Sequence, residues 1–219
     1  MKTAVFFDVD DTIIDGQTQK LLVFYLYRQK KISFIFLLNI YLWFLFYKMG
    51  IVSKDTSIMI KSYRLVKGLQ VREFKNLLLN FFEKEIKTRI YPQAIERINF
   101  HKNKGHEIVL ISKSINILIE TIKDYLNVSM SISTELEVKD GVFTGEINGD
   151  IIHGKEKVKA IKKLIPEKNW NLENSYAYGD HCSDFPILEI VGYPAIVNPS
   201  RRLKKEAKKR NWTTYFWKL

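Results

Sequence analysis

Cysteine is almost absent from this chain of 219 residues, which contains only Cys182. One cysteine cannot form an internal disulfide, so the class of small disulfide-stapled secreted domains is excluded. The first residues are already typical of a strand and carry no secretory signal pattern, so we expect a cytoplasmic protein. Cys182 has no paired base in the sequence, and a small filler residue is the simplest interpretation of it.

Acidic residues are also in short supply. The chain has 35 lysines and arginines against 24 acids, a formal net charge of +11. This excess of positive charge favours an anionic partner, and an anionic substrate, an anionic membrane surface and nucleic acid are the alternatives. Seven of the ten residues in Arg201–Arg210 are basic, which is typical of a solvated helix face or, alternatively, of a phosphate or anionic-lipid patch. Nucleic acid is disfavoured, because no interleaved aromatic residues and no recognisable nucleic-acid module occur.

The sequence also lacks an uncharged run that is long enough to span a bilayer. The uncharged segment Ile32–Tyr47 has 16 residues, fewer than the roughly 20 that a spanning helix needs. Its apolar residues surround the whole helical wheel, so a helix here is either buried or in contact with lipid. Lysines flank the segment, and Trp43 is of a type favoured at membrane interfaces. We keep plain burial and peripheral contact with a membrane as equal alternatives.

Strand and helix patterns alternate over most of the chain. Hydrophobic residues make up 46% of it, enough for a full core. The predicted strands are Thr3–Asp8, Glu107–Ser112, Val128–Ile132, Ser175–Tyr178 and Pro194–Val197. The predicted helices are Gln93–Lys104, Ser114–Tyr125, Lys155–Leu164, Phe185–Ile190 and Arg202–Arg210. This alternation predicts an α/β fold with a doubly wound, Rossmann-like parallel sheet.

Three local features modify that plan. Residues 15–87 interrupt the alternation and read as a helical insertion directly after the first strand, which leaves 1–14 and 88–219 as the α/β core. Asp140-Gly141 lies between two alternating runs and predicts a hairpin. Pro166 predicts the end of the preceding helix.

Two carboxylates mark the end of the first strand. The apolar run before Asp8 reads as a buried strand, and Asp8 and Asp10 leave its carboxyl end close to one another. Ligands bind at this end of the strands in open α/β sheets. Close carboxylates repel unless a cation or a proton lies between them, and Mg²⁺ fits because it prefers oxygen ligands.

Later segments supply complementary groups in a fixed order. The strand before Ser112 ends in a hydroxyl, and a helical pattern opens with Lys155 and Lys157. A third apolar run ends at Asp180, with Asp184 four residues later. Carboxylates that hold a cation, together with a hydroxyl and an ammonium that hold phosphate oxygens, describe a site for a metal-bound phosphoryl group.

At these residues the chain resembles the haloacid dehalogenase superfamily of phosphatases. The run from Asp8 to Thr12 is similar to the family's DxDxT motif, and the segment from Gly179 to Asp184 is similar to its GDxxxD motif. Ser112 and a lysine before the following helix complete the set in order. The insertion stands where the phosphoserine-phosphatase-like branch, subfamily IB, has its cap. Some members of this subfamily act on lipid phosphates such as phosphatidylglycerophosphate.

The resemblance implies a role for each matching residue. Asp8 is implied as the nucleophile that forms an aspartyl-phosphate, and Asp10 as the general acid and base. Mg²⁺ is implied to bind Asp8, Asp180 and Asp184, with the backbone carbonyl of Asp10 as a further ligand. Ser112 and a lysine are implied to bind the phosphoryl oxygens. The spacing to the apolar residues that follow favours Lys157, with Lys155 in reserve.

Two departures from the phosphoserine-phosphatase pattern bear on the substrate. Gln17 stands where that branch has an acid for the substrate's ammonium, and a loose cap alignment places Ser62 where it has an arginine for the carboxylate. Each missing charge-assisted partner costs about 1.5–3 kcal/mol. We therefore expect a Mg²⁺-dependent phosphomonoesterase acting on a small-molecule or lipid phosphate. The alternatives are a phosphoserine phosphatase and a non-catalytic protein that binds anionic surfaces.

Overall fold

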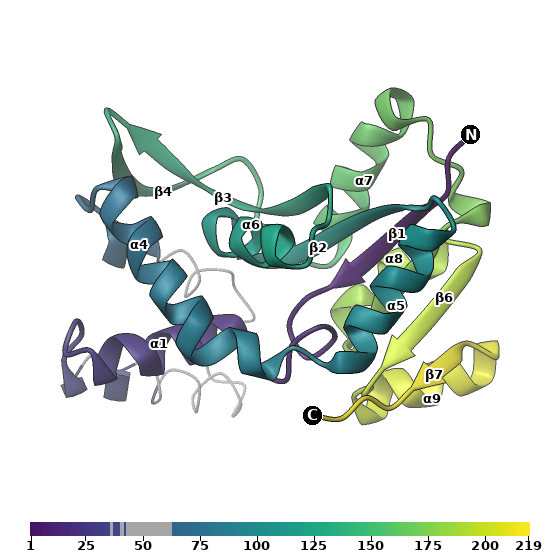
Figure 1. Cartoon of the computed structure of the whole chain (residues 1–219), viewed down its shortest axis with the longest axis horizontal. Helices are drawn as coiled ribbons and strands as arrows, with labels where there is room; N and C mark the ends of the chain where they lie inside the picture. Colours follow the sequence, from purple (N-terminus) through teal and green to yellow (C-terminus); the bar gives the residue numbers. More distant parts are fainter. Residues whose placement is uncertain (36, 40–41, 43–62) are drawn as a thin grey trace.

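A seven-stranded sheet forms the centre of the molecule in the computed structural model, which describes residues 1–35, 37–39, 42 and 63–219 (Figure 1). The strand order is β4-β3-β2-β1-β5-β6-β7, and every neighbouring pair is parallel except β3 and β4. The bounds are β1 Ala4–Asp8, β2 Glu107–Ile115, β3 Met130–Lys139, β4 Val142–Asn148, β5 Tyr176–Gly179, β6 Tyr193–Val197 and β7 Thr213–Tyr215. Strands β2, β3 and β4 lie on one side of β1, and β5, β6 and β7 lie on the other. The predicted doubly wound α/β fold is therefore confirmed.

Helices cover both faces of the sheet. They are α5 Pro92–Asn103, α6 Asn116–Tyr125, α7 Lys155–Lys168, α8 Phe185–Ile190 and α9 Arg201–Arg210. Val5 and Phe7 of β1 belong to the apolar layer that contains α5 and α6. Ala4 and Phe6 belong to the layer that contains α7, α8 and α9. All five residues of β1 are buried, because side chains alternate between two covered faces.

The predicted helix ends hold to within two residues, with one exception at the end of α7; α6 begins at Asn116 and not at Ser114, because β2 continues to Ile115. Pro92 occupies the first turn of α5, where its missing N–H costs nothing. Pro166 was expected to end its helix, but α7 continues to Lys168, and Asn169 in the left-handed conformation ends it instead. Near a carboxyl end, proline removes only one of the last backbone hydrogen bonds, so the helix tolerates it.

The predicted hairpin is present and longer than expected. Asp140 and Gly141 both have positive φ, at 51° and 75°, which suits the tight turn between β3 and β4. β3 therefore runs without a break from the predicted strand into the hairpin. The short strand β7 was not predicted, because Thr213–Tyr215 is too short to show an alternating pattern.

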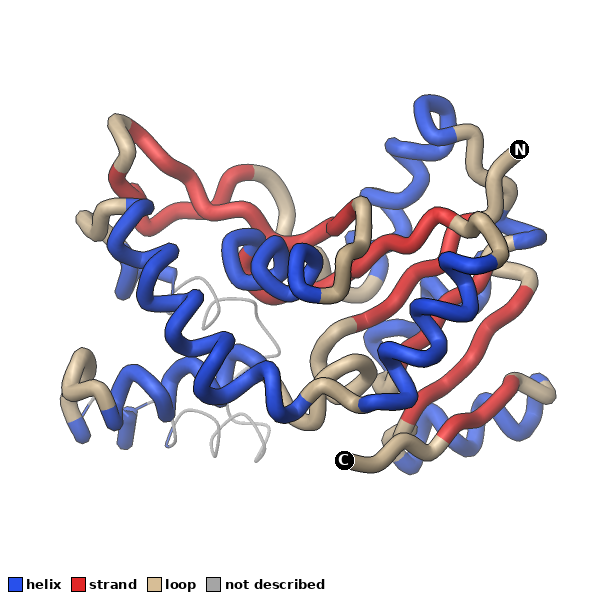
Figure 2. The backbone as a smooth tube through the Cα atoms, viewed as in Figure 1, coloured by secondary structure: helices blue, strands red, loops and turns tan. Residues whose placement is uncertain are grey.

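Helical segments make up most of the described chain between Thr18 and α5. They are α1 Thr18–Arg28, the 3₁₀ turn Arg64–Val66, α4 Val71–Phe81, the π turn Phe82–Ile86 and the 3₁₀ turn Lys87–Arg89. Figure 2 shows α4 running from the tip of the β3–β4 hairpin back towards the start of α5. Backbone hydrogen bonds join the loop before α4 to the hairpin, from Gly68 to Phe143 at 2.9 Å and from Val71 to Gly141 at 3.0 Å.

Two sequence predictions concern residues that the structure does not describe. Half of the apolar segment Ile32–Tyr47 lies outside the described residues, and so does Ser62. Among the described residues, no helix combines the length and the apolar character that a bilayer crossing requires. The division at residues 14/15 and 87/88 into core and cap stays an interpretation.

Candidate active site

Three carboxylates meet at the carboxyl ends of β1 and β5. Asp8 is the last residue of β1, Asp180 follows β5, and Asp184 lies in the 3₁₀ turn Cys182–Asp184 that precedes α8. One carboxylate oxygen from each lies within 4.8 Å of the other two. Gly179 allows this approach, because a Cβ there would stand 2.6 Å from the Cβ of Asp184. The sequence prediction that these acids converge matches this geometry.

Lys157 joins two of these acids. Its ammonium donates to Asp8 Oδ1 at 2.5 Å and to Asp184 Oδ1 at 2.7 Å, and its side chain is buried. The first turn of α7 holds it there, while Ile161, one turn later, packs into the apolar layer beneath. Lys155 is exposed. Of the two lysines weighed from the sequence, Lys157 is the one in the cluster.

The charge in this cluster is unbalanced. Burial, together with the like charges of nearby acids, raises the pKa of Asp180 to about 9. Burial also raises the pKa of Asp8 to about 8, although the Lys157 ammonium opposes the shift. One ammonium cannot neutralise three carboxylates, so the cluster calls for another positive charge. The donors are all carboxylate oxygens, which suit a hard divalent cation such as Mg²⁺. Asp8, Asp180 and Asp184 would hold it.

Asp10 is placed beside this cluster with one oxygen left over. Its Oδ1 accepts a hydrogen bond of 2.8 Å from the backbone N–H of Thr18, the first residue of α1. Within the described structure, its Oδ2 is buried without a hydrogen-bond partner. Burial raises the pKa of Asp10, and the charge of Lys113 partly opposes this shift. A buried carboxyl group with an unpartnered oxygen is suited to exchange a proton with a bound molecule.

Ser112 lies on the strand next to Asp8. Asp8 pairs in register with Ile111, so Ser112 comes one residue further along β2. Its hydroxyl oxygen accepts from the backbone N–H of Ser114 at 3.1 Å, which leaves the hydroxyl proton available for an acceptor. The predicted phosphate-binding hydroxyl thus stands beside the carboxyl end of β1, although β2 itself continues three residues further, to Ile115.

Sequence reasoning missed several polar residues around Asp10. The hydroxyls of Thr18 and Ser114 share a hydrogen bond of 2.5 Å. The Tyr63 hydroxyl accepts from Gln19 at 3.2 Å and donates to the Lys113 carbonyl at 3.4 Å. The one sequence feature that could have indicated these contacts is the pair Lys113 and Ser114, directly after Ser112.

Two further polar residues near the site, Asp15 and His181, form hydrogen bonds of their own. Asp15 accepts from the Tyr91 hydroxyl at 3.1 Å, and the His181 ring accepts from the Ser183 N–H at 3.3 Å. Cys182 is half-buried and packs against the apolar layer of α7 and α8, in keeping with a filler residue.

The comparisons with known proteins agree with this geometry. Residues 5–189 match the haloacid dehalogenase-like hydrolase family. The chain belongs to this family. The four segments of the candidate site lie within the matched region.

Two curated relatives and one solved structure cover nearly the whole chain. The inhibition of morphological differentiation protein of Streptomyces azureus is 32% identical over 96% of this chain and 77% of its own length. Phosphoserine phosphatase SerB1 of Mycobacterium tuberculosis is 29% identical over 97% of this chain and 70% of its own. A structure described as a phospho-aspartyl intermediate analogue of phosphoserine phosphatase has a TM-score of 0.69 and 21% identity, covering 98% of this chain and 93% of that one. The similarity in fold therefore includes the helical segments after β1.

Proposed function

We propose that this protein is a Mg²⁺-dependent phosphomonoester hydrolase that works through an aspartyl-phosphate on Asp8. The observation that carries the proposal is the cluster of Asp8, Asp180 and Asp184 around the buried ammonium of Lys157. A binding protein for anionic surfaces has no need of clustered buried acids, because they repel the anions it must bind. The phosphatase name of a relative that covers 97% of this chain supports the same activity.

Each residue has a task that follows from its position. A carboxylate oxygen of Asp8 attacks the phosphorus atom, the bond to the leaving oxygen breaks, and Asp10 gives that oxygen a proton. Asp10 then takes a proton from the water that hydrolyses the aspartyl-phosphate, and Asp8 is regenerated. Lys157 and Ser112 donate to phosphoryl oxygens in both steps. Bound Mg²⁺ would supply positive charge that offsets the charge of the phosphoryl group.

The proposed substrate is a phosphate on a lipid or another apolar molecule. Gln17, at the start of α1, offers no charge to an ammonium. Large apolar side chains on and after α1 are exposed, at 54% for Phe24, 61% for Phe34 and 70% for Ile35. Together with the basic helix α9, such a surface suits contact with an anionic membrane. The alternative, phosphoserine, is favoured by the name of the mycobacterial relative.

Phosphate release tests the activity and the substrate class together. An aryl phosphate, phosphoserine and a lipid phosphate in neutral detergent are compared with and without Mg²⁺. We expect turnover that vanishes with a chelator, returns with Mg²⁺ and recovers poorly with Ca²⁺, whose coordination is looser. Full activity in excess chelator would exclude the metal. Efficient phosphoserine turnover, together with no flotation on anionic vesicles, would favour the alternative.

A further inference from the structure

Lys113 is a second lysine at the candidate active site, and the mechanism above does not use it. It follows Ser112 in β2. Val109 and Ile111, two and four residues earlier, pack in the apolar layer that contains α7. Side chains alternate along a strand, so Lys113 continues this face. Phe6 of β1 belongs to the same layer, which puts Asp8 on this face as well.

The backbone at Lys113 is fixed by contacts from two directions. Its carbonyl oxygen accepts from Thr134 Oγ1 on β3 at 2.8 Å and from the Tyr63 hydroxyl at 3.4 Å. The register between β2 and β3 shifts between Ser112 and Ile115. Such irregularities re-aim side chains and occur next to active sites. The backbone of Lys113 is therefore fixed within β2, and the residue does not lie on a loose loop.

In the part of the chain that the structure describes, the Lys113 ammonium forms no ion pair, although its charge acts on the carboxyl group of Asp10. Lys157, in contrast, is bound to two carboxylates. Lys113 is half-buried, and its charge lowers the pKa of His153 and opposes the rise at Asp10. A half-buried ammonium gains most from an anion that replaces its lost water. A bound anion would supply the hydrogen-bond partner that this ammonium lacks among the described residues.

We propose that Lys113 binds a second anionic group of the substrate, a carboxylate or a phosphodiester a few atoms from the phosphate that is cleaved. The inference rests on the proposed phosphatase function and narrows its substrate class. Gln17 offers no charge to a neighbouring ammonium, so we expect a second anion without an amine beside it. Both candidate groups present oxygen acceptors with one negative charge, which is what an ammonium recognises.

Two matched substrate pairs test this inference. 3-Phosphoglycerate differs from glycerol 3-phosphate by a carboxylate in place of a hydroxymethyl group. Phosphatidylglycerophosphate differs from phosphatidic acid by an additional glycerol that is joined through a phosphodiester, and both are offered in the same neutral detergent. We expect kcat/KM to favour the substrate with the second anion by about tenfold or more in at least one pair, since a charge-assisted hydrogen bond has this size. The pair that shows the preference identifies the group.

Variants assign the preference to Lys113. Lys113→Met should reduce it to about twofold or less, and Lys113→Arg should retain most of it. Lys155→Met, which removes an exposed lysine at the start of α7, is the control and should keep the ratio of the wild-type protein. Phosphoserine and phosphoethanolamine complete the set, and neither should exceed 3-phosphoglycerate.

The possible failures can be told apart. No preference in either pair, or a preference that Lys113→Met retains, overturns the role of Lys113. An equal loss on both members of a pair, with a shifted pH profile, also overturns it and shows that Lys113 acts through Asp10. Absence of turnover on an aryl phosphate with Mg²⁺ would overturn the phosphatase proposal instead.

Discussion

Phe7 and Asp8 are neighbours in β1, yet they point into two buried polar clusters of opposite character. Phe7 stacks on Tyr178 at 4.4 Å between ring centroids and meets the edge of His101 at 6.3 Å. Asp8 meets Lys157 on the other face of the sheet. One strand therefore separates an aromatic cluster of His101, His106 and Tyr178 from the acid cluster of the candidate active site.

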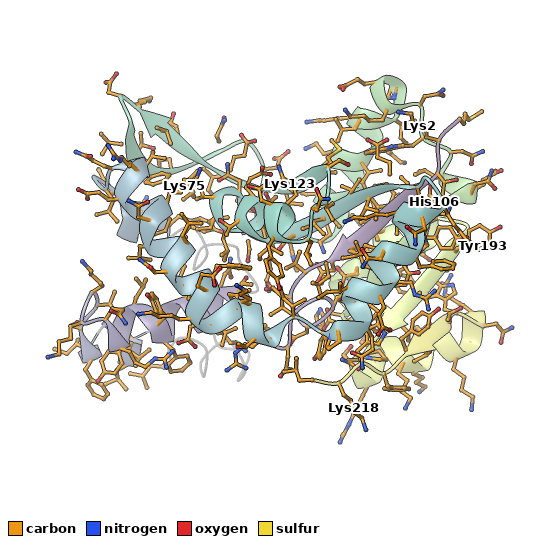
Figure 3. The ribbon with its side chains drawn as sticks, viewed as in Figure 1. Lys2, Lys75, His106, Lys123, Tyr193 and Lys218 are labelled. Carbon is orange, nitrogen blue, oxygen red and sulfur yellow. The ribbon has the colours of Figure 1, made fainter. Side chains whose placement is uncertain are left out.

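The aromatic cluster is complete in itself. Nδ1 of His101 lies 2.9 Å from Nδ1 of His106, and Nε2 lies 2.8 Å from the Tyr178 hydroxyl. Burial lowers the pKa of His101 to about 3, so the ring is neutral at neutral pH. The ring of Tyr176 stacks on His106, just before β2, and on Tyr193, at the start of β6. Figure 3 labels His106 and Tyr193. This end of the sheet is opposite the acids.

The acid cluster is incomplete without a bound molecule. Its carboxylates outnumber its ammonium, and Asp10 retains an unpartnered oxygen within the described structure. The comparison teaches how to separate two kinds of buried polar group. Groups that satisfy one another stabilise the fold, whereas groups that leave charge or hydrogen bonds unmatched indicate a ligand. Substitutions in each cluster should therefore change different measurements.

The largest effect is expected from Asp8→Asn. It removes the proposed nucleophile with little change of shape, so turnover of an aryl phosphate should fall by about 10⁴-fold or more. The melting temperature should stay close to that of the wild-type protein, because one of several repelling charges is lost. Asp11→Asn is the control, since Asp11 has a φ of 57°, which asparagine also adopts. Near-normal turnover in Asp8→Asn would refute the assigned nucleophile.

The two lysines at the start of α7 offer a sharper comparison within the acid cluster. Lys157→Ala removes a buried donor to the proposed phosphoryl site and should lower kcat by about 10²–10³-fold. Lys155→Ala changes an exposed side chain and should stay within about twofold. Steady-state phosphate release measures both. A larger loss in Lys155→Ala would reverse the assignment.

In the aromatic cluster, a substitution should change stability and leave turnover intact. His101→Phe leaves the buried Tyr178 hydroxyl without its partner and should lower the free energy of unfolding by about 1–3 kcal/mol. Tyr193→Phe, on a side chain that is 51% exposed, should stay within about 0.5 kcal/mol. Urea denaturation measures both. If His101→Phe abolishes turnover in a folded protein, the aromatic cluster belongs to the active site.

Only one of these clusters could be predicted from the sequence. Asp8, Ser112, Lys157 and Asp180 each stand at a strand end or a helix start, and parallel strands bring their carboxyl ends together whatever the loops between them do. The acid cluster thus follows from order and register alone. His101 and Tyr178 lie inside ordinary helix and strand patterns, and their contact depends on how α5 packs on β5.

The fold likewise contains elements that could be predicted from the sequence and contacts that could not. A long apolar run predicted β1 to within one residue, because both faces of a central strand are buried. β2 continues three residues beyond its predicted end at Ser112, where the apolar run stops. The contacts of Tyr63 and Thr18 with the site could not be foreseen, because the segment between β1 and α5 has no register with the sheet. The prediction that Pro166 ends its helix was wrong, because the free-energy cost of a proline depends on its distance from the helix end. A local sequence pattern does not reveal that distance.

The smallest expected effect is a difference between the wild-type protein and His101→Phe in how stability falls at acid pH. The folded-state pKa of His101 is about 3, against about 6.5 in an unfolded chain. Between these two pH values, His101 is protonated in the unfolded chain but not in the folded protein. The stabilisation is therefore fully present above pH 6.5 and is lost as the pH falls towards 3, by at most about 1.4 kcal/mol per pH unit. Burial lowers the pKa of His106 as well, in the same direction.

Urea denaturation of the wild-type protein and of His101→Phe from pH 4.5 to 7.5 isolates this contribution. Arg97 and Lys104 also disfavour the charged ring, and both are present in the two proteins, as are the titrating acids of the active site. The stability of His101→Phe should fall less steeply with acid, and the two curves should run parallel only above about pH 6.5. Parallel curves over the whole range would mean that the folded protein accepts a proton at His101. The aromatic cluster would then be open to a ligand, as the acid cluster is.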